Sequence, residues 1–408
     1  MRNIAYKDYK KSSDIHGTVL YPAVMVAPVQ NDLLADLIEQ NKVIDIIDPF
    51  HGSGTALYEA AKISSSVNLY GSDINPLANL ITTVKLQGVD FSVIEENIAL
   101  LDKYLHSDTD IAEHTFYNIE KWFKPNIIKS LSKIRNAIIQ IENDKNRLFF
   151  WYCMSDIIRK HSNTRSCTYK LYSKTESDIS KINDTSIKDF LDKVRRDYPR
   201  FVPLPNKLCL YKGDCLDYLH SKNNATFDIC ITSPPYGDNA TTVTYGQFSM
   251  LPLIWIGEKD LALEGWEFKN YSIIDSKSLG GCENQADVTD TNLVFVNWYL
   301  SRISEDKRRK VTRFFNGYFE FLKEICRTTK KFIILTLGDR TVSGVKINLT
   351  KITERVLGQL GFELTERAHR EIASKRTPQV LAYQKDGTAI KSMTIETVLV
   401  FERKDYRL

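Results

Sequence analysis

The amino-acid sequence predicts an α/β fold built around a parallel sheet, and three stretches carry this prediction. Residues 43–73 read as an apolar strand (VIDIIDP), a glycine turn with a helical pattern (GTALYEAAK) and a second strand (VNLYGSD). This order is typical of a right-handed crossover between parallel strands. Strand patterns return at residues 208–235 (LCLYKGD and FDICITSPP), and FELTERAHR and ETVLVFER near the C-terminus alternate as antiparallel strands do.

The pattern of strands and helices divides the chain into five segments. Residues 1–95 contain the first half of the core, and residues 96–200 read as a mostly helical insertion. Residues 201–256 return to the core. Residues 257–330 are polar and irregular before a basic helical stretch, which predicts a second insertion, and residues 331–408 hold the last strands of the core.

Composition sets few limits on function, because 43% hydrophobic and 26% charged residues are ordinary for a soluble globular protein. The N-terminus lacks the apolar run of a secretory signal, and no stretch approaches about 18 apolar residues, so we expect a cytoplasmic protein with no membrane partner. With a formal net charge of +4, a nucleic acid would have to bind to a local basic patch. The seven cysteines show no CxxC pair, and we expect no metal site.

The first motif is the turn DPFHGSGT at residues 48–55, which ends a strand and opens a helix. Its glycines let the backbone approach a ligand closely, and the helix N-terminus leaves amide donors available. A dinucleotide fingerprint would have a third glycine where this chain has Leu57, which disfavours a nicotinamide or flavin. Asp73 ends the second strand, where a carboxylate accepts hydrogen bonds from ribose hydroxyls, and Asp214 either contacts an adenine amino group or shapes a turn.

The second motif is TSPPY at residues 232–236, again at the end of a strand. Two consecutive prolines stiffen the turn and remove two backbone donors, so carbonyl oxygens are left to face a cavity as acceptors. The Ser233 hydroxyl oxygen and the Pro234 carbonyl would accept both hydrogens of an exocyclic amino group. Tyr236 would then stack on a base extruded from the duplex.

Together, DPFHGSGT, GSDINPLA and TSPPYG resemble the motifs of the DNA amino-methyltransferases, which act on cytosine N4 or adenine N6. The segment YPAVMVAP at residues 21–28 is similar to the motif that lines the methionine pocket in that family. The resemblance covers residues 16–95, 205–256 and 330–402. It implies an S-adenosylmethionine cofactor and a Rossmann-like class I methyltransferase sheet of seven strands with the last one antiparallel. The cofactor turn precedes the SPPY motif here, so the motif order is permuted relative to many members with a serine in this motif.

The motifs, the strand ends and the clusters of basic residues yield three sets of candidate residues. The catalytic set is Ser233, Pro234, Pro235 and Tyr236. The cofactor-binding set is Tyr21, Pro22, Asp48, Pro49, Phe50, Gly52, Gly54, Thr55, Asp73, Ile74, Asp214, Cys215 and Ser233. The nucleic-acid-binding set is Arg159, Lys160, Arg165, Lys170, Thr242, Tyr245, Arg308, Arg309, Lys375 and Arg376.

The expected function is methyl transfer from S-adenosylmethionine to the amino group of a flipped base in double-stranded DNA. By resemblance, serine ahead of Pro-Pro-Tyr favours cytosine N4, with adenine N6 as the alternative. C5-cytosine chemistry is disfavoured because it needs a nucleophilic cysteine, typically after a proline, and no cysteine follows a proline here. Two other readings stay open: an RNA amino-methyltransferase, and a non-catalytic subunit of a restriction complex. A cognate restriction endonuclease is a possible partner, and either insertion could hold the target-recognition region.

Overall fold

A computed structural model of the chain describes residues 6, 8–107, 111–237, 243–261, 272–279, 294–371, 380–383, 389–391 and 395–406. Three residues of the nucleic-acid-binding set, Thr242, Lys375 and Arg376, lie outside these ranges. No helix within them is long and apolar enough to cross a membrane.

Seven strands form the central sheet, in the order β3-β2-β1-β4-β5-β11-β8. Their bounds are β1 (Asp45–Asp48), β2 (Asn68–Ser72), β3 (Leu208–Tyr211), β4 (Phe227–Thr232), β5 (Thr329–Leu337), β8 (Phe362–Glu371) and β11 (Ile395–Arg403). The first five run parallel, whereas β11 is antiparallel to both of its neighbours. The predicted Rossmann-like sheet, with its last strand antiparallel, is therefore confirmed.

Both faces of the sheet are covered by helices, which is why its strands read as continuous apolar runs. Adjacent residues Ile46 and Ile47 of β1 are both fully buried, and they belong to different hydrophobic clusters. One cluster includes residues of α1 (Ala27–Gln40) and α2 (Thr55–Ile63). The other includes residues of three helices: α10 (Cys215–His220), α15 (Glu305–Thr328) and α16 (Leu349–Gln359).

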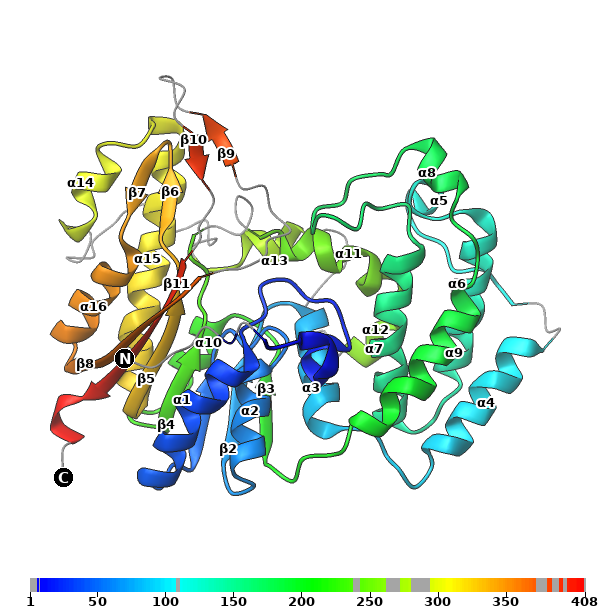
Figure 1. The fold of residues 1–408 in the computed structure, drawn as a ribbon, viewed down its shortest axis with the longest axis horizontal. Helices are drawn as coiled ribbons and strands as arrows, with labels where there is room; N and C mark the ends of the chain where they lie inside the picture. Colours follow the sequence, from blue (N-terminus) through cyan, green and yellow to red (C-terminus); the bar gives the residue numbers. More distant parts are fainter. Residues whose placement is uncertain are drawn as a thin grey trace.

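A helical lobe interrupts the connection from β2 to β3 and lies to one side of the sheet (Figure 1). It follows α3 (Pro76–Gln87) and contains α4 (Ile94–His106), α5 (Ile119–Trp122), α6 (Pro125–Ile139), α7 (Asp144–His161), α8 (Glu176–Ser180) and α9 (Ser186–Asp197). Aromatic residues of α7 fill its core, with Phe149, Phe150 and Trp151 fully buried. The Trp151 indole donates to Asp260 at 2.7 Å, which joins the lobe to the connection between β4 and β5.

That second connection is more helical than the sequence indicates. It contains α11 (Tyr245–Trp255), α12 (Glu258–Leu261), α13 (Ser272–Ser276), α14 (Asn297–Leu300) and α15. The remaining elements are β6 (Arg340–Val342), β7 (Val345–Ile347), β9 (Val380–Tyr383), β10 (Ala389–Lys391), and the 3-10 turns η1 (Lys11–Ser13), η2 (Ile15–Gly17), η3 (Tyr198–Arg200) and η6 (Lys404–Tyr406). The α11 helix packs on α3 and α7, so the connection lies between the sheet and the helical lobe (Figure 1).

The strand order reverses at β1, because β2 continues the sheet on one side and β4 on the other. In open α/β sheets, a crevice forms outside the carboxyl ends of the strands at such a switch point, and ligands bind there. Both sequence motifs follow strands at this position: the glycine turn follows β1 and the SPPY motif follows β4.

Candidate active site

The glycine turn after β1 has a conformation that its sequence requires. Gly52 and Gly54 have φ angles of 51° and 72°, a region that residues with a side chain rarely adopt. A Cβ atom on Gly54 would also lie only 2.7 Å from the Thr82 hydroxyl oxygen. Gly54 is the N-cap of α2, which begins at Thr55. The turn therefore brings bare backbone and a helix N-terminus to the edge of the sheet.

Asp48 connects the two motifs at the switch point. Its carboxylate is fully buried, and Oδ1 accepts hydrogen bonds from the Thr232 hydroxyl at 2.7 Å and from the Phe50 amide at 3.1 Å. Oδ2 is also buried and has no hydrogen-bond partner among the described residues. Burial raises the pKa of Asp48 to about 7. Around it, the Pro49 carbonyl accepts from Ser72 at 2.9 Å, which holds the turn against β2.

Asp73 follows β2 and lies directly against the turn. Its Oδ2 accepts a hydrogen bond from the Gly52 amide at 2.9 Å, and its Oδ1 accepts one from the Asn75 amide at 2.8 Å. Each carboxylate oxygen keeps a further lone pair, so Asp73 could still accept two hydroxyl donors. Burial raises the pKa of Asp73. The next residue, Ile74, packs against the core of the helical lobe.

Asp214 and Cys215 lie after β3 at the same edge of the sheet. Asp214 is the N-cap of α10, and its side chain accepts a hydrogen bond from the Leu216 amide at 2.7 Å. Burial raises its pKa. Cys215 is buried as the first residue of α10. The capping role agrees with the turn-forming reading of Asp214.

Tyr21, from the N-terminal segment, packs against the glycine turn. It is buried, and its hydroxyl oxygen accepts from the Asn75 side-chain amide at 3.0 Å. Its ring comes within 3.6 Å of the position that a Cβ atom on Gly52 would occupy. The rings of Tyr245 and Phe248 pack against it, with centroids 5.9 and 6.0 Å away. Pro22, next in the chain, is also buried.

In the SPPY motif, the Ser233 hydroxyl is oriented by its neighbours. It donates to the Thr336 carbonyl of β5 at 3.2 Å and lies 3.0 Å from the Tyr236 hydroxyl. Because its proton is used for Thr336, Ser233 Oγ is left as an acceptor. Pro234 is buried, whereas Pro235 and Tyr236 are half-buried. A cavity of about 20 Å³ adjoins Ser233, which is room for a water molecule and far too little for a base.

The structure thus brings most of the cofactor and catalytic sets together at the carboxyl ends of neighbouring strands. It does not gather the basic residues. Arg159 donates to the Phe248 carbonyl at 3.2 Å and stacks on the Phe248 ring, so it takes part in internal contacts. Lys160 is exposed and paired with Asp189 at 2.8 Å, while Arg165, Arg308 and Arg309 are exposed and Lys170 is half-buried. Arg159, Lys160, Arg165 and Lys170 lie in the helical lobe. Arg308 and Arg309 lie on α15, in the part of the molecule that contains the sheet (Figure 1).

Four residues of the site escape the sequence analysis: Asn75, Asn79, Thr82 and Lys85. All are buried and lie at or after the N-terminus of α3, and their side chains hold Tyr21 or residues of the glycine turn. For Asn79, Thr82 and Lys85, the signal in the sequence is the occurrence of polar residues three apart within an apolar helix, NLITTVK.

These residues fit the expected S-adenosylmethionine. Its sulfonium and ammonium groups are cationic, and the buried Asp48 Oδ2 is an acceptor without a partner in the described part of the chain. Its ribose carries hydroxyl donors, and Asp73 has lone pairs available beside the bare backbone of Gly52. The aromatic rings of Tyr21 and Tyr245 supply an apolar wall.

No protein-family model matches the chain. The chain is 27% identical over 419 residues to the type II methyltransferase M.MvaI of Kocuria varians, across 95% of this chain and 90% of that protein. Two solved structures are also similar: a proposed RNA methyltransferase of Pyrococcus horikoshii (8% identity, TM-score 0.32, 94% of this chain and 83% of that one), and the rRNA methyltransferase aviRa of Streptomyces viridochromogenes (10%, 0.32, 97% and 94%).

Structural likeness at a TM-score of 0.32 is too loose to bear on either fold or substrate. The fold stands on the strand order of this chain itself, with β11 antiparallel between β5 and β8. The sheet order, the glycine turn at its switch point and the similarity to M.MvaI along nearly the whole chain make this protein an S-adenosylmethionine-dependent methyltransferase of the Rossmann-like fold.

Proposed function

We propose that the protein methylates DNA on the exocyclic amino group of a flipped base, with cytosine N4 favoured over adenine N6. The observation that carries this proposal is the oriented acceptor at Ser233, which directly follows the strand whose last residue is bonded to Asp48. An amino group donates two hydrogens, and this loop offers hydroxyl and carbonyl oxygens to receive them. The similarity to a type II methyltransferase supports DNA as the substrate.

In this proposal, S-adenosylmethionine supplies an activated methyl group, and the chain aligns the amino nitrogen with it. The Ser233 hydroxyl oxygen and the Pro234 carbonyl accept the amino hydrogens and direct the nitrogen lone pair. Such alignment is worth up to about 7–11 kcal/mol in favourable cases. Because positive charge grows on the nitrogen during transfer, these acceptors bind the transition state more tightly than the substrate.

Tyr236 is proposed to hold the extruded base by stacking, as base-flipping enzymes commonly do. In the structure its ring packs against the cluster that includes α15 residues, and its hydroxyl uses one lone pair of Ser233 Oγ. A hydroxyl oxygen has two lone pairs, so the second stays available for an amino hydrogen. Tyr236 would therefore hold the base with its ring, while its hydroxyl leaves one lone pair of Ser233 Oγ available to the base.

DNA phosphates are proposed to meet exposed cations on both sides of the active site, among them Lys160 and Arg165 in the helical lobe and Arg308 and Arg309 on α15. Target recognition is assigned to the helical insertion or to residues 257–330. The second segment already reaches the site, because Asp275 accepts from the Gly246 amide at 3.1 Å, at the N-terminus of α11. A cytoplasmic setting and a cognate endonuclease complete the proposal.

The test is expression in a methylation-deficient host, followed by mass spectrometry of nucleosides from its DNA and its RNA. We expect N4-methyldeoxycytidine in the DNA. Finding N6-methyldeoxyadenosine instead would change the proposed target base to adenine and leave the proposed active site as it is. A new methylated nucleoside confined to RNA would contradict the DNA assignment, and no product in either pool, with cofactor still bound, would indicate a non-catalytic subunit.

Cofactor affinity is expected to fall when the pH is lowered below about 7. The pKa of Asp48 is raised to about 7 in the folded protein without ligand, so protonation removes the negative charge that pairs with a cationic ligand. A single site of this kind lowers affinity by at most about tenfold per pH unit. Without ligand, the same raised pKa makes the contribution of Asp48 to stability greatest at acid pH, and this contribution is lost as the pH rises through about 7.

Calorimetric titration with S-adenosylmethionine between pH 6 and 8 measures this dependence. Asp48→Asn is the matched variant, because an amide keeps the size and the acceptor for Thr232 while losing the titration. We expect weaker binding and a flatter pH profile in this variant. A wild-type profile with the same slope as that of Asp48→Asn would exclude Asp48 as the titrating group.

A further inference from the structure

One face of α3 contacts three successive residues of the glycine turn. Asn79, Thr82 and Lys85 are spaced by three, so they follow one another along a helix face. The Asn79 carbonyl oxygen lies 3.0 Å from His51 Nε2, the Thr82 hydroxyl donates to the Gly52 carbonyl at 3.0 Å, and Lys85 Nζ donates to the Ser53 carbonyl at 2.8 Å. All three side chains are buried. We call them the α3 ladder.

The ladder contacts the part of the turn where backbone orientation matters most. The peptide between Ser53 and Gly54 is held at both ends, because its carbonyl accepts from Lys85 and its amide donates to the His51 carbonyl at 2.7 Å. Asn79 also donates to the Asp73 carbonyl at 2.8 Å. The ladder therefore joins the turn to the residue proposed to bind ribose.

Lys85 is the member of the ladder whose burial costs the most free energy, because its side chain is charged when protonated. It is fully buried, and its contacts are the Ser53 carbonyl and His16 Nδ1, the latter 3.4 Å away, rather than a carboxylate. Burial lowers its pKa to about 7, with Lys11 adding to the decrease and Asp14 and Glu59 opposing it. A buried lysine usually needs direct pairing to offset the loss of hydration. Its burial without a paired carboxylate points to a role for its contact with the Ser53 carbonyl.

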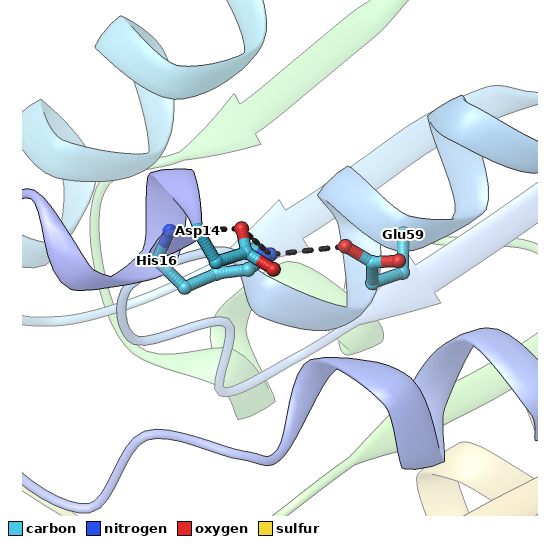
Figure 2. A group of neighbouring side chains, drawn as sticks. All are labelled: Asp14, His16 and Glu59. Carbon is cyan, nitrogen blue, oxygen red and sulfur yellow. Dashed lines mark hydrogen bonds and ion pairs between the residues drawn. The ribbon is translucent and has the colours of Figure 1, made fainter. Parts of the chain in front are cut away.

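A second layer supports Lys85 from behind. His16 Nε2 lies 3.1 Å from Glu59 Oε1, and Asp14 lies beside them (Figure 2). Glu59 accepts further hydrogen bonds from Asn31 and Lys62, each at 3.0 Å. Asp14, His16 and Glu59 are close enough to hold a metal ion, yet Lys85 and Lys62 already bring positive charge to the same cluster. We therefore read the cluster as the support for Lys85.

We propose that the α3 ladder, backed by His16 and Glu59, is a set of positioning residues that presets the glycine turn to bind S-adenosylmethionine. The proposal rests on the proposed role of this turn in cofactor binding. None of the ladder side chains needs to touch the cofactor. The ladder side chains lower the free energy that is needed to hold the turn in its cofactor-binding conformation. Their loss should therefore weaken cofactor affinity and leave the rate of methyl transfer at saturating cofactor unchanged.

The experiment compares Thr82→Val with Thr82→Ser, and adds Lys85→Met with Lys62→Met as its control. Valine has the shape of threonine without its hydroxyl, whereas serine keeps the hydroxyl. Lys62 is 47% exposed and contacts Glu59, so its loss removes charge from the same cluster without touching the turn. The readouts are the Kd for S-adenosylmethionine by calorimetry, KM and kcat for methyl transfer, and the melting temperature.

We expect Thr82→Val and Lys85→Met to raise Kd and KM for the cofactor by about 10- to 100-fold, because each removes a buried side-chain donor to a backbone carbonyl of the turn. Thr82→Ser should recover most of the affinity, Lys62→Met should match the wild type, and kcat should stay within about threefold. If Lys85→Met does not fold, the Thr82 pair decides alone. An unchanged Kd in Thr82→Val overturns the proposal, and so does an equal loss in Thr82→Val and Thr82→Ser.

Measuring Asp73→Ala in the same experiment distinguishes a failure of the ladder proposal from a failure of the proposed role of the glycine turn in cofactor binding. If Asp73→Ala abolishes binding while the ladder variants bind normally, the turn binds the cofactor and the ladder is merely structural. If Asp73→Ala also binds normally, the cofactor lies elsewhere, and the proposed function of this edge of the sheet fails with it.

Discussion

Asp73→Ala is expected to weaken S-adenosylmethionine binding by about 10²- to 10⁴-fold, since it would remove the two hydrogen bonds proposed between this carboxylate and the ribose hydroxyls, each worth about 1.5–3 kcal/mol. The Gly52 and Asn75 amides each hold one lone pair of one Asp73 oxygen and leave a second lone pair on each oxygen for a ligand. The substitution also frees the Gly52 amide, so the turn loses an anchor. Calorimetry on the purified protein measures the change directly.

Two variants make this result interpretable. Asp73→Asn keeps the size and one acceptor oxygen, so we expect an intermediate loss of affinity. Asp214→Ala removes an aspartate at the end of another strand, where its visible contact is the cap of α10. Its loss should lower stability by about 0.5–2 kcal/mol, as expected for a helix cap. Unchanged cofactor affinity in Asp73→Ala would contradict the proposed ribose role of Asp73.

Ser233→Ala is expected to lower kcat by about 10²- to 10³-fold, the usual cost of removing one preorganised partner of a developing charge. Cofactor affinity should stay within about threefold of the wild type, because Ser233 is bonded to Thr336 and Tyr236 rather than to the glycine turn. Single-turnover methyl transfer from labelled S-adenosylmethionine to DNA measures the first quantity, and calorimetry measures the second.

Variants of Tyr236 separate the serine from the aromatic ring. Tyr236→Phe removes the hydroxyl that lies 3.0 Å from Ser233 Oγ and keeps the ring, so kcat should change little. Tyr236→Ala removes the ring, and a lost stacking contact of about 1–3 kcal/mol should weaken DNA binding by about 10- to 100-fold. If Ser233→Ala transfers methyl groups at the wild-type rate, the proposed acceptor is wrong and the Pro234 carbonyl alone would have to hold the amino group.

The central strands β1 and β4 could be recognised from sequence because they are apolar on both sides, whereas β8 shows the alternation of a half-exposed antiparallel strand. Ile46 and Ile47 are both fully buried, on opposite faces of β1, so the strand stands out from any amphipathic helix. The positions of Asp73 and Ser233 then follow from the rule that parallel strands end at the same edge. Glycine marks the end of β1 and proline the end of β4.

Other features depend on contacts distant in sequence. The helix α11 begins at Tyr245 and continues through Pro252, although a proline removes a backbone donor from the interior of a helix. Packing against α3 and α7 outweighs the cost of an internal proline there. Arg159 reads as a phosphate contact in a basic run, but the carbonyl and ring of Phe248, 89 residues away, occupy its guanidinium group.

The sequence by itself determined the sheet, its switch point and the two motifs at the strand ends, because burial and turn geometry leave a local record in residue type. Only the tertiary structure decided which contacts surround those motifs. Ser233 donates to a carbonyl of β5, Asp48 of β1 accepts from Thr232 of β4, and the buried Lys85 of α3 donates to the glycine turn. A polar residue inside an apolar helix shows that a partner must exist. Which partner it has depends on how the crossovers pack, and no local pattern records that.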